Sequence, residues 1–265
     1  MFPLRDNIPS RTFPFVNYII MGICCIAFLI QSIDSSGILT MQFAMIPLRI
    51  SQPDQPIVVE VEGVVQTSVG VQPVVVEKVL PPGPIPPWMT VITCVFLHGS
   101  LMHLLGNMWF LYIFGDNVED RLGHVGFVVF YLVTGAAASL SHFLIEPGSE
   151  IPTVGASGAI AGVMGAYLLF YPHARVMTLI PIAFFLQMMV VPAPIFLGLW
   201  FVLQLIQGTF SIGAAHAAGV AWWAHIGGFV AGLLIAWFMN RTNVTHPQVR
   251  VVRPGTERSG MYRIR

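Results

Sequence analysis

Charged side chains are scarce in this sequence of 265 residues. Only 9% are Asp, Glu, Lys or Arg, against about 25% in soluble domains, whereas 55% are hydrophobic and the mean hydropathy is +0.77. Because so few charges cannot solvate a globular surface, lipid must cover much of the chain. The formal net charge is zero and no basic tract is present, which excludes the usual signature of a nucleic-acid-binding protein.

Metal ligands and reactive cysteines are also lacking. The three cysteines lie in or beside apolar runs without metal-ligand spacing, so we interpret them as small core residues. They are Cys24, Cys25 and Cys94. Three histidines, His98, His103 and His225, lack both an H-E-x-x-H pattern and a nearby acidic residue. We therefore predict no metal site and no cofactor.

Long apolar runs make up much of the sequence. A bilayer core needs about 20 apolar residues per helix. We predict six transmembrane helices, at about 14–33, 100–116, 124–144, 157–172, 194–210 and 221–240. No A-x-A cleavage site follows the first run, which favours a retained span over a secretory signal. The apolar stretch 176–191 contains Pro181 and ends at Pro192, so it either lies along the membrane interface or extends the fifth helix.

Positive charge favours six spans over seven. With the N-terminus inside, six spans leave only Arg49 and Lys78 outside, and the other ten cations inside. These ten are Arg5, Arg11, Arg121, Arg175, Arg241, Arg250, Arg253, Arg258, Arg263 and Arg265. A seventh span would place the arginines of the C-terminal tail outside, against the positive-inside rule.

The predicted fold is an all-α integral membrane protein, a bundle of six transmembrane helices with a small β-containing insertion in its first outer loop. Residues 1–13 form a cytoplasmic N-terminus, 14–33 the first helix, 34–87 the outer loop, 88–240 a core with the other five helices, and 241–265 a cytoplasmic tail. Two valine-rich runs with interleaved polar residues in the outer loop predict a strand pair. We interpret this loop as a structured insertion without chemistry.

Ser157 and His225 each begin an apolar run. On the six-span count the second, fourth and sixth helices run inward from the outer face, so His103, Ser157 and His225 lie at similar depth. An ionisable residue at membrane depth is costly and is functional by default. A hydroxyl nucleophile beside an imidazole base would form a hydrolase site, although Ser157 taken alone is also typical of a packing serine.

Small residues at helical spacing indicate that the fourth and sixth helices touch. Gly158 and Gly162 lie four residues apart, as do Gly228 and Gly232. Such faces let two helix backbones approach closely. We therefore assign structural roles to Gly158, Gly228 and Gly232.

His103 and Asn107 lie four residues apart and share one helix face. Their side chains can donate hydrogen bonds to a developing oxyanion, and in a dry site each such donor contributes about 3–4 kcal/mol. The Ser157 N–H at a helix N-terminus would add another donor, and Gly155 belongs to the same oxyanion and substrate-binding region. The alternative for His103 and Asn107 is a pair of interhelical hydrogen bonds without chemistry.

Together these segments resemble the rhomboid family of intramembrane serine proteases over about residues 88–240. Gly155-Ala156-Ser157-Gly158 matches the family's G-x-S-G, and His103 with Asn107 matches its H-x-x-x-N. Gly219, Ala224-His225-Ile226-Gly227-Gly228 and Gly232 match its last motif, and Val118-Glu119 with Gly123 matches the turn after the second span, where we expect Glu119 to be structural.

The resemblance implies a Ser157–His225 dyad without a third carboxylate, with the oxyanion held by His103, Asn107 and the Ser157 N–H. It implies cleavage of single-span membrane proteins within or next to their helix, with the fifth span and the loop at about 209–219 gating entry. The partners are then transmembrane substrates and the lipid bilayer, and the expected location is a bacterial cytoplasmic membrane. No feature specifies an oligomeric state.

Two positions depart from the family pattern. Many members carry an aromatic residue under the histidine ring where this chain has Ala161, which leaves open what orients His225. The Trp-Arg pair of the first outer loop is also absent.

Two other functions compete. A catalytically silent relative that binds client transmembrane helices is disfavoured because both Ser157 and His225 are kept. A small transporter would predict inverted repeats, and the sequence has no convincing internal repeat.

Overall fold

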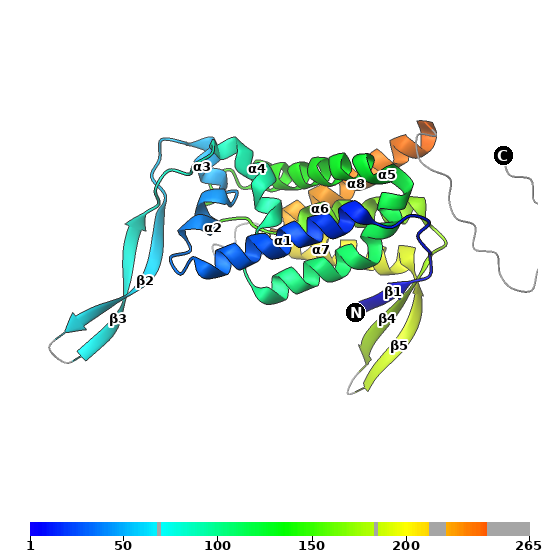
Figure 1. The fold of residues 1–265 in the computed structure, drawn as a ribbon, viewed down its shortest axis with the longest axis horizontal. Helices are drawn as coiled ribbons and strands as arrows, with labels where there is room; N and C mark the ends of the chain where they lie inside the picture. The colour runs from blue at the N-terminus through cyan, green and yellow to red at the C-terminus, as the bar shows by residue number, and fades with distance from the viewer. Residues whose placement is uncertain (68–69, 183–184, 212–220, 243–265) are drawn as a thin grey trace, which may run out of the picture.

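The computed structural model describes residues 1–67, 70–182, 185–211 and 221–242, and most of these residues are helical (Figure 1). The long helices α1 (Phe15–Ile33), α5 (Leu101–Ile145), α7 (Ala193–Ser211) and α8 (Trp222–Thr242) are each long and apolar enough to cross a membrane. Helix α6 (Ser157–Phe170) is apolar but shorter, with 14 residues. Most of the predicted entry loop at 209–219 and of the tail 241–265 lies outside the described residues.

Short helices connect the first span to the rest of the bundle. They are α2 (Ile38–Phe43), α3 (Pro47–Ser51), η1 (Pro87–Met89), α4 (Thr90–Thr93) and η2 (Cys94–Phe96). Among them, η2 leads toward the start of α5, where Ser100 caps the helix by accepting a hydrogen bond from the backbone N–H of His103.

Segment α5 spans 45 residues and consists of two helices that meet at a kink at Gly123, where φ is 71° and ψ is 165°. A straight helix of that length would measure about 68 Å, more than twice the thickness of a hydrocarbon core. The left-handed φ, which glycine adopts without strain, lets the chain reverse. In Figure 1 the first half runs along the lower side of the bundle and the second half along its upper side. The second and third predicted spans correspond to these two halves.

Helix α6 lies at the centre of the bundle. Every residue from Gly158 to Tyr167 is buried. A Cβ atom at Gly228 of α8 would collide with the carbonyl oxygen of Gly158, and one at Gly232 would collide with that of Gly162. Because only glycine fits at these positions, the backbones of α6 and α8 come into direct contact.

Acidic residues near the break in α5 hold the N-terminal segment in place. The buried Glu119 accepts hydrogen bonds from the backbone N–H groups of Val16 and Asn17, at 3.0 Å and 2.7 Å. Asp120 accepts from Arg11 and from the backbone and hydroxyl of Thr12. Glu119 thus satisfies donors that the first turn of α1 leaves without partners inside the helix.

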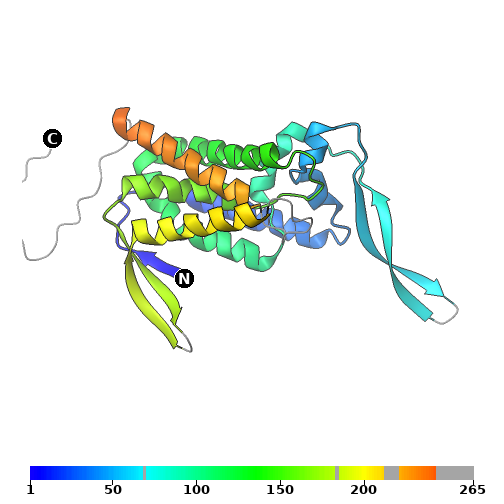
Figure 2. The same ribbon diagram turned by 180° about the vertical axis from the view of Figure 1, so that it is seen from behind.

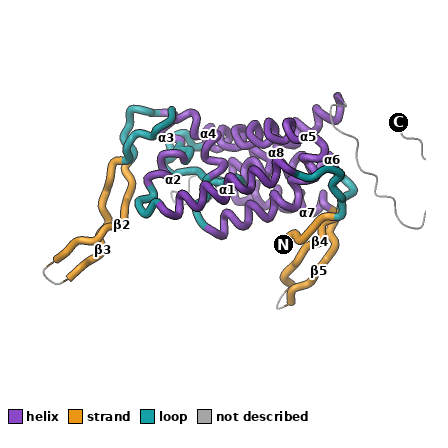
Figure 3. Tube along the Cα trace, viewed as in Figure 1, coloured by secondary structure: helices purple, strands orange, loops and turns teal. Residues whose placement is uncertain are grey.

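Two β-structures project from opposite ends of the bundle (Figures 2 and 3). Strands β2 (Val58–Thr67) and β3 (Gly70–Val79) form an antiparallel hairpin between α3 and η1. At the other end, β1 (Phe2–Asp6), β4 (Arg175–Ile182) and β5 (Phe185–Pro192) form an antiparallel sheet in the order β1-β4-β5.

The stretch 176–191 is therefore not an extension of the fifth helix, which begins at Ala193. Pro181 has no N–H to donate within a helix, and the many branched and aromatic side chains around it suit strands. An apolar run of this length has no periodicity that separates a strand from a buried helix.

Candidate active site

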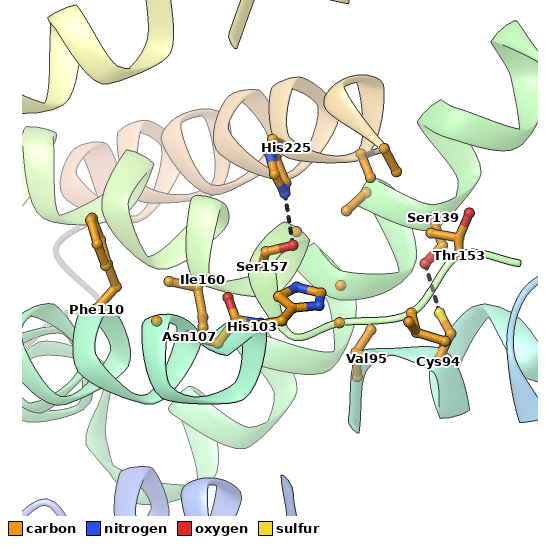
Figure 4. Close-up of a pocket in the computed structure, with 18 of the residues that line it drawn as sticks. Cys94, Val95, His103, Asn107, Phe110, Ser139, Thr153, Ser157, Ile160 and His225 are labelled. Atoms are coloured by element: carbon orange, nitrogen blue, oxygen red, sulfur yellow. Dashed lines mark hydrogen bonds between the residues drawn. The ribbon is translucent and has the colours of Figure 1, made fainter. Parts of the chain in front are cut away.

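Ser157 and His225 meet although 68 positions separate them in the sequence. Ser157 is the first residue of α6 and His225 lies in the first turn of α8. The Nε2 atom of His225 lies 2.7 Å from the Oγ atom of Ser157 (Figure 4). This distance is that of a hydrogen bond between a nucleophile and its base. The contact of Gly158 with Gly228 lies within one turn beyond both residues, so it sets this spacing.

The other ring nitrogen of His225 has a partner that the sequence did not indicate. Its Nδ1 atom lies 2.7 Å from Oε1 of Gln204, a residue of α7 that is 6% exposed. An amide oxygen can only accept, so Nδ1 carries the proton and Nε2 is left with a lone pair toward Ser157. This is the tautomer that a general base requires. A lone Gln in an apolar helix gives no sign of which side it faces, which is why the sequence did not reveal it.

Aromatic rings flank His225 from two helices. The ring centroids of Trp200 in α7 and Trp222 in α8 each lie 6.0 Å from that of His225, the first tilted by 38° and the second nearly perpendicular at 86°. Trp200 lies one helical turn before Gln204. Ala161 is fully buried in α6, and its methyl group provides no ring against the imidazole. The two indoles and the Gln204 amide thus contact the imidazole together with the Ser157 hydroxyl.

A cavity of about 370 Å³ opens beside the hydroxyl, and His103, Asn107, Ser157 and His225 all line it. His103 and Asn107 come from the first half of α5, and in Figure 4 both lie on the side of Ser157 away from His225. The Nδ2 atom of Asn107 is buried and has no hydrogen-bond partner among the described residues. A buried N–H donor without a partner costs stability, which is typical of a group kept for a ligand.

Gly155 forms the wall between this donor pair and the start of α6. Its φ is 130°, and its N–H donates to the carbonyl of Cys94 at 2.9 Å. A Cβ atom at Gly155 would lie 2.7 Å from Cε1 of His103. Only glycine therefore allows His103 to lie against this backbone.

His98 lies behind the site rather than in it. Its ring is 2% exposed, is 5.3 Å from that of His103, and is not part of the cavity wall. The backbone N–H and C=O of His98 both bond to the side chain of Gln31 in α1. Within the described ranges, no group of three or more His, Cys, Asp or Glu residues could hold a metal ion.

Comparison with known proteins adds independent findings. A family model described as the Rhomboid domain matches residues 86–242, which is more than half of the chain. Rhomboid-like protein 11, chloroplastic, of Arabidopsis thaliana is 29% identical over 160 residues, covering 59% of this chain and 54% of that protein. Rhomboid protein 1, mitochondrial, of Saccharomyces cerevisiae is 27% identical over 172 residues, covering 63% of this chain and 46% of that protein.

A bacterial relative matches a shorter segment. Rhomboid protease GluP of Bacillus subtilis is 37% identical over 81 residues, covering 31% of this chain and 15% of that protein. The chain spans about half the length of the two eukaryotic relatives and less of the bacterial one.

Proposed function

This chain belongs to the rhomboid family, and from that premise we propose that it is an intramembrane serine endopeptidase that cuts single-span membrane proteins within or next to their transmembrane segment. The observation that carries the proposal is the 2.7 Å contact between Ser157 Oγ and His225 Nε2 at the wall of a cavity. The chain is an integral membrane protein with helices long and apolar enough to span a bilayer.

In the proposed reaction, Ser157 Oγ attacks the carbonyl carbon of the scissile peptide bond while its proton passes to His225 Nε2. The tetrahedral intermediate collapses as the C–N bond breaks, and the imidazolium donates its proton to the leaving amine. Water then attacks the resulting acyl-Ser157 ester with His225 again as base. The second product leaves as a carboxylic acid and Ser157 regains its proton.

The oxyanion of each tetrahedral intermediate would be held by Asn107, His103 and the Ser157 N–H. The unpartnered Nδ2 atom of Asn107 supports this assignment, because it is a donor already placed in the cavity. Each donor aimed at the developing charge contributes about 3–4 kcal/mol to the transition state.

The proposal includes a six-span topology. The two halves of α5 would each cross the bilayer, and α6 would begin within it, so that Ser157 lies below the outer surface. Residues 88–240 would form the catalytic core, 34–87 an outer insertion, and 1–13 and 241–265 the cytoplasmic ends. The relatives include chloroplastic and mitochondrial proteins, so they do not support the prediction of a bacterial cytoplasmic membrane.

A catalytically silent protein that binds client helices is the second candidate, because the cavity and the helix bundle would serve it equally. Cleavage of a single-span reporter in liposomes separates the two. We expect the native protein to cut, and Ser157→Ala and His225→Ala each to lose cleavage while still binding the reporter. Binding without cleavage by the native protein would favour the silent relative, and cutting by both alanine variants would refute the dyad.

A further inference from the structure

Among the side chains of α7 whose burial the structure describes, Gln204 is the one polar side chain that is buried, and it hydrogen-bonds to His225. Its neighbours Leu203 and Leu205 are exposed on the bundle surface, which lipid covers. Turning an amide inward from such a helix is unfavourable unless it finds a hydrogen-bond partner. The partner is Nδ1 of His225, at 2.7 Å.

We infer that Gln204 is a positioning residue for the reaction proposed above: it holds His225 with the proton on Nδ1, so that Nε2 can accept the proton of Ser157. The inference rests on the proposed function for its catalytic consequence. In the absence of an acceptor at Nδ1, the neutral ring can carry its proton on Nε2, and it is then unable to act as a base. The position of α7 therefore determines the orientation of a base that belongs to α8.

Three variants test this inference in the liposome assay. Gln204→Ala removes the acceptor and should lower kcat about tenfold or more, with little change in KM. Gln207→Ala is the matched control, since Gln207 lies on the same helix but is exposed, and it should cleave as the native protein does. Gln204→Glu keeps an acceptor and stabilises the imidazolium, so activity should return with the acid limb of its pH profile moved to higher pH.

A spectroscopic readout makes the test independent of turnover. The chain has eight histidines, all of which are labelled when the protein is made with ¹⁵N-histidine. The signals of His225 are those that disappear in His225→Ala. The native ring should show a protonated Nδ1 and a bare Nε2, and Gln204→Ala should shift it toward the other tautomer. The same tautomer in both proteins, or native kcat and pH profile in Gln204→Ala, would overturn the inference. A native protein that shows the Nδ1–H tautomer but cuts nothing would instead refute the proposed function.

A second, independent observation concerns the sheet β1-β4-β5. Phe185, Leu186 and Met188 of β5 are 72%, 68% and 71% exposed. The sequence has no Asp, Glu, Lys or Arg between Arg175 and Arg241. Phe185 lies on one face of the strand, and Leu186 and Met188 lie on the other, so both faces of β5 expose apolar side chains. Exposed apolar surface of this kind marks a contact with another molecule or with a membrane.

The surroundings of the sheet point to lipid. Strand β4 follows α6 and β5 leads directly into α7, with the N–H of Ala193 donating to the carbonyl of Ala174 at 2.8 Å. The sheet therefore lies at the end of α7, a helix long and apolar enough to span a bilayer, and Figures 1 and 2 show the hairpin projecting sideways from that end of the bundle. Ile195 and Leu199, in the first two turns of α7 directly after β5, are exposed apolar side chains as well.

We propose that this sheet docks onto the bilayer, with the β5 side chains inserted at the boundary between headgroups and acyl chains on the side of the N-terminus. Strand β5 is at the edge of the sheet, and an edge with free N–H and C=O groups is excluded from the hydrocarbon core. At the boundary, water and headgroups can satisfy that edge while the apolar side chains leave water.

A spin label at Met188→Cys, in protein reconstituted into phosphatidylcholine–phosphatidylglycerol vesicles, measures directly whether β5 lies in the bilayer. The background is Cys25→Ala, because Cys25 is the exposed native thiol while Cys24 and Cys94 are buried. The label should collide readily with oxygen and poorly with a water-soluble nickel chelate. A label at Leu199→Cys in α7 should show the same preference. A label at Val79→Cys, an exposed residue at the end of β3, should show the reverse preference.

Two results would overturn the docking proposal. A Met188 label as accessible to nickel as the Val79 label would place the sheet in water. A label shielded from both reagents would mean that protein covers the strand, such as a second copy of this chain paired through β5.

Discussion

Gly228 faces the carbonyl oxygen of Gly158 so closely that no side chain fits between them. Gly228 lies three residues after His225, and Gly158 lies one residue after Ser157. The separation of α6 and α8 at this point therefore fixes the separation of the hydroxyl and the imidazole.

Gly228→Ala should for this reason damage both stability and cleavage. The obstacle is a backbone carbonyl that cannot move aside, and overpacking of this kind costs about 1–3 kcal/mol. Because the helices must part, we expect kcat/KM for the reporter to fall by at least about 10²-fold. The control is Gly22→Ala in α1, where an added Cβ would have no atom within 4 Å. Equal activity of Gly228→Ala and the native protein would show that the glycine contact does not set the site.

Asn107→Leu should separate stability from activity. It removes a buried Nδ2 that has no partner among the described residues, so the unfolding midpoint in detergent micelles should stay the same or rise. It also removes a proposed oxyanion donor, so kcat should fall about 10²–10³-fold. Asn107→Asp, which keeps the shape but cannot donate when ionised, should be equally inactive. Native kcat in either variant would remove Asn107 from the mechanism.

Much of this arrangement was predictable from the sequence, because membrane insertion is encoded in long apolar runs. The first, fifth and sixth predicted spans, 14–33, 194–210 and 221–240, agree with α1, α7 and α8 to within two residues at each end. The approach of Ser157 to His225 followed from counting spans. Each residue begins a predicted span, and the chain crosses the membrane twice between them, which returns it to the same depth.

The partner of His225 and the sheet were not predictable in the same way. Helix α7 is apolar on nearly every side, so its sequence does not specify the rotation that turns Gln204 inward. The stretch 176–191 is also apolar apart from Thr178 and Gln187, and its periodicity does not separate a strand from a buried helix. Both features depend on contacts between segments far apart in the chain.

Glu119→Ala should destabilise the bundle without touching the cavity. Its carboxylate is fully buried and accepts the N–H groups of Val16 and Asn17, and removing it leaves both donors without an acceptor. We expect a loss of about 3 kcal/mol in the free energy of unfolding. Glu119→Gln, which keeps one acceptor oxygen, should lose less, and Glu150→Ala on the exposed surface should lose almost nothing. A native unfolding midpoint for Glu119→Ala would contradict this assignment.

Asp6 should make the stability of the protein depend on pH. Burial raises the pKa of its carboxyl from 3.8 to about 7, in spite of the hydrogen bond that it accepts from the Tyr167 hydroxyl. Between these two values the folded protein keeps a proton that the unfolded chain has lost. The contribution of Asp6 to stability is therefore greatest below about pH 4, falls as the pH rises to about 7, and is flat above it, with a total change of at most about 4 kcal/mol.

Asp6→Asn should abolish this pH dependence, because its side chain is neutral throughout. Its unfolding midpoint should match that of the native protein near pH 4.5 and exceed it at pH 8, when both are measured by thermal unfolding in detergent micelles. Asp54→Asn, at an exposed carboxyl, controls for the change in net charge and should follow the native curve. If the unfolding midpoints of Asp6→Asn and of the native protein changed in parallel between pH 4.5 and pH 8, Asp6 would not hold the proton that is lost over this range. The packing of β1 against α6 would then have to be explained without a protonated Asp6.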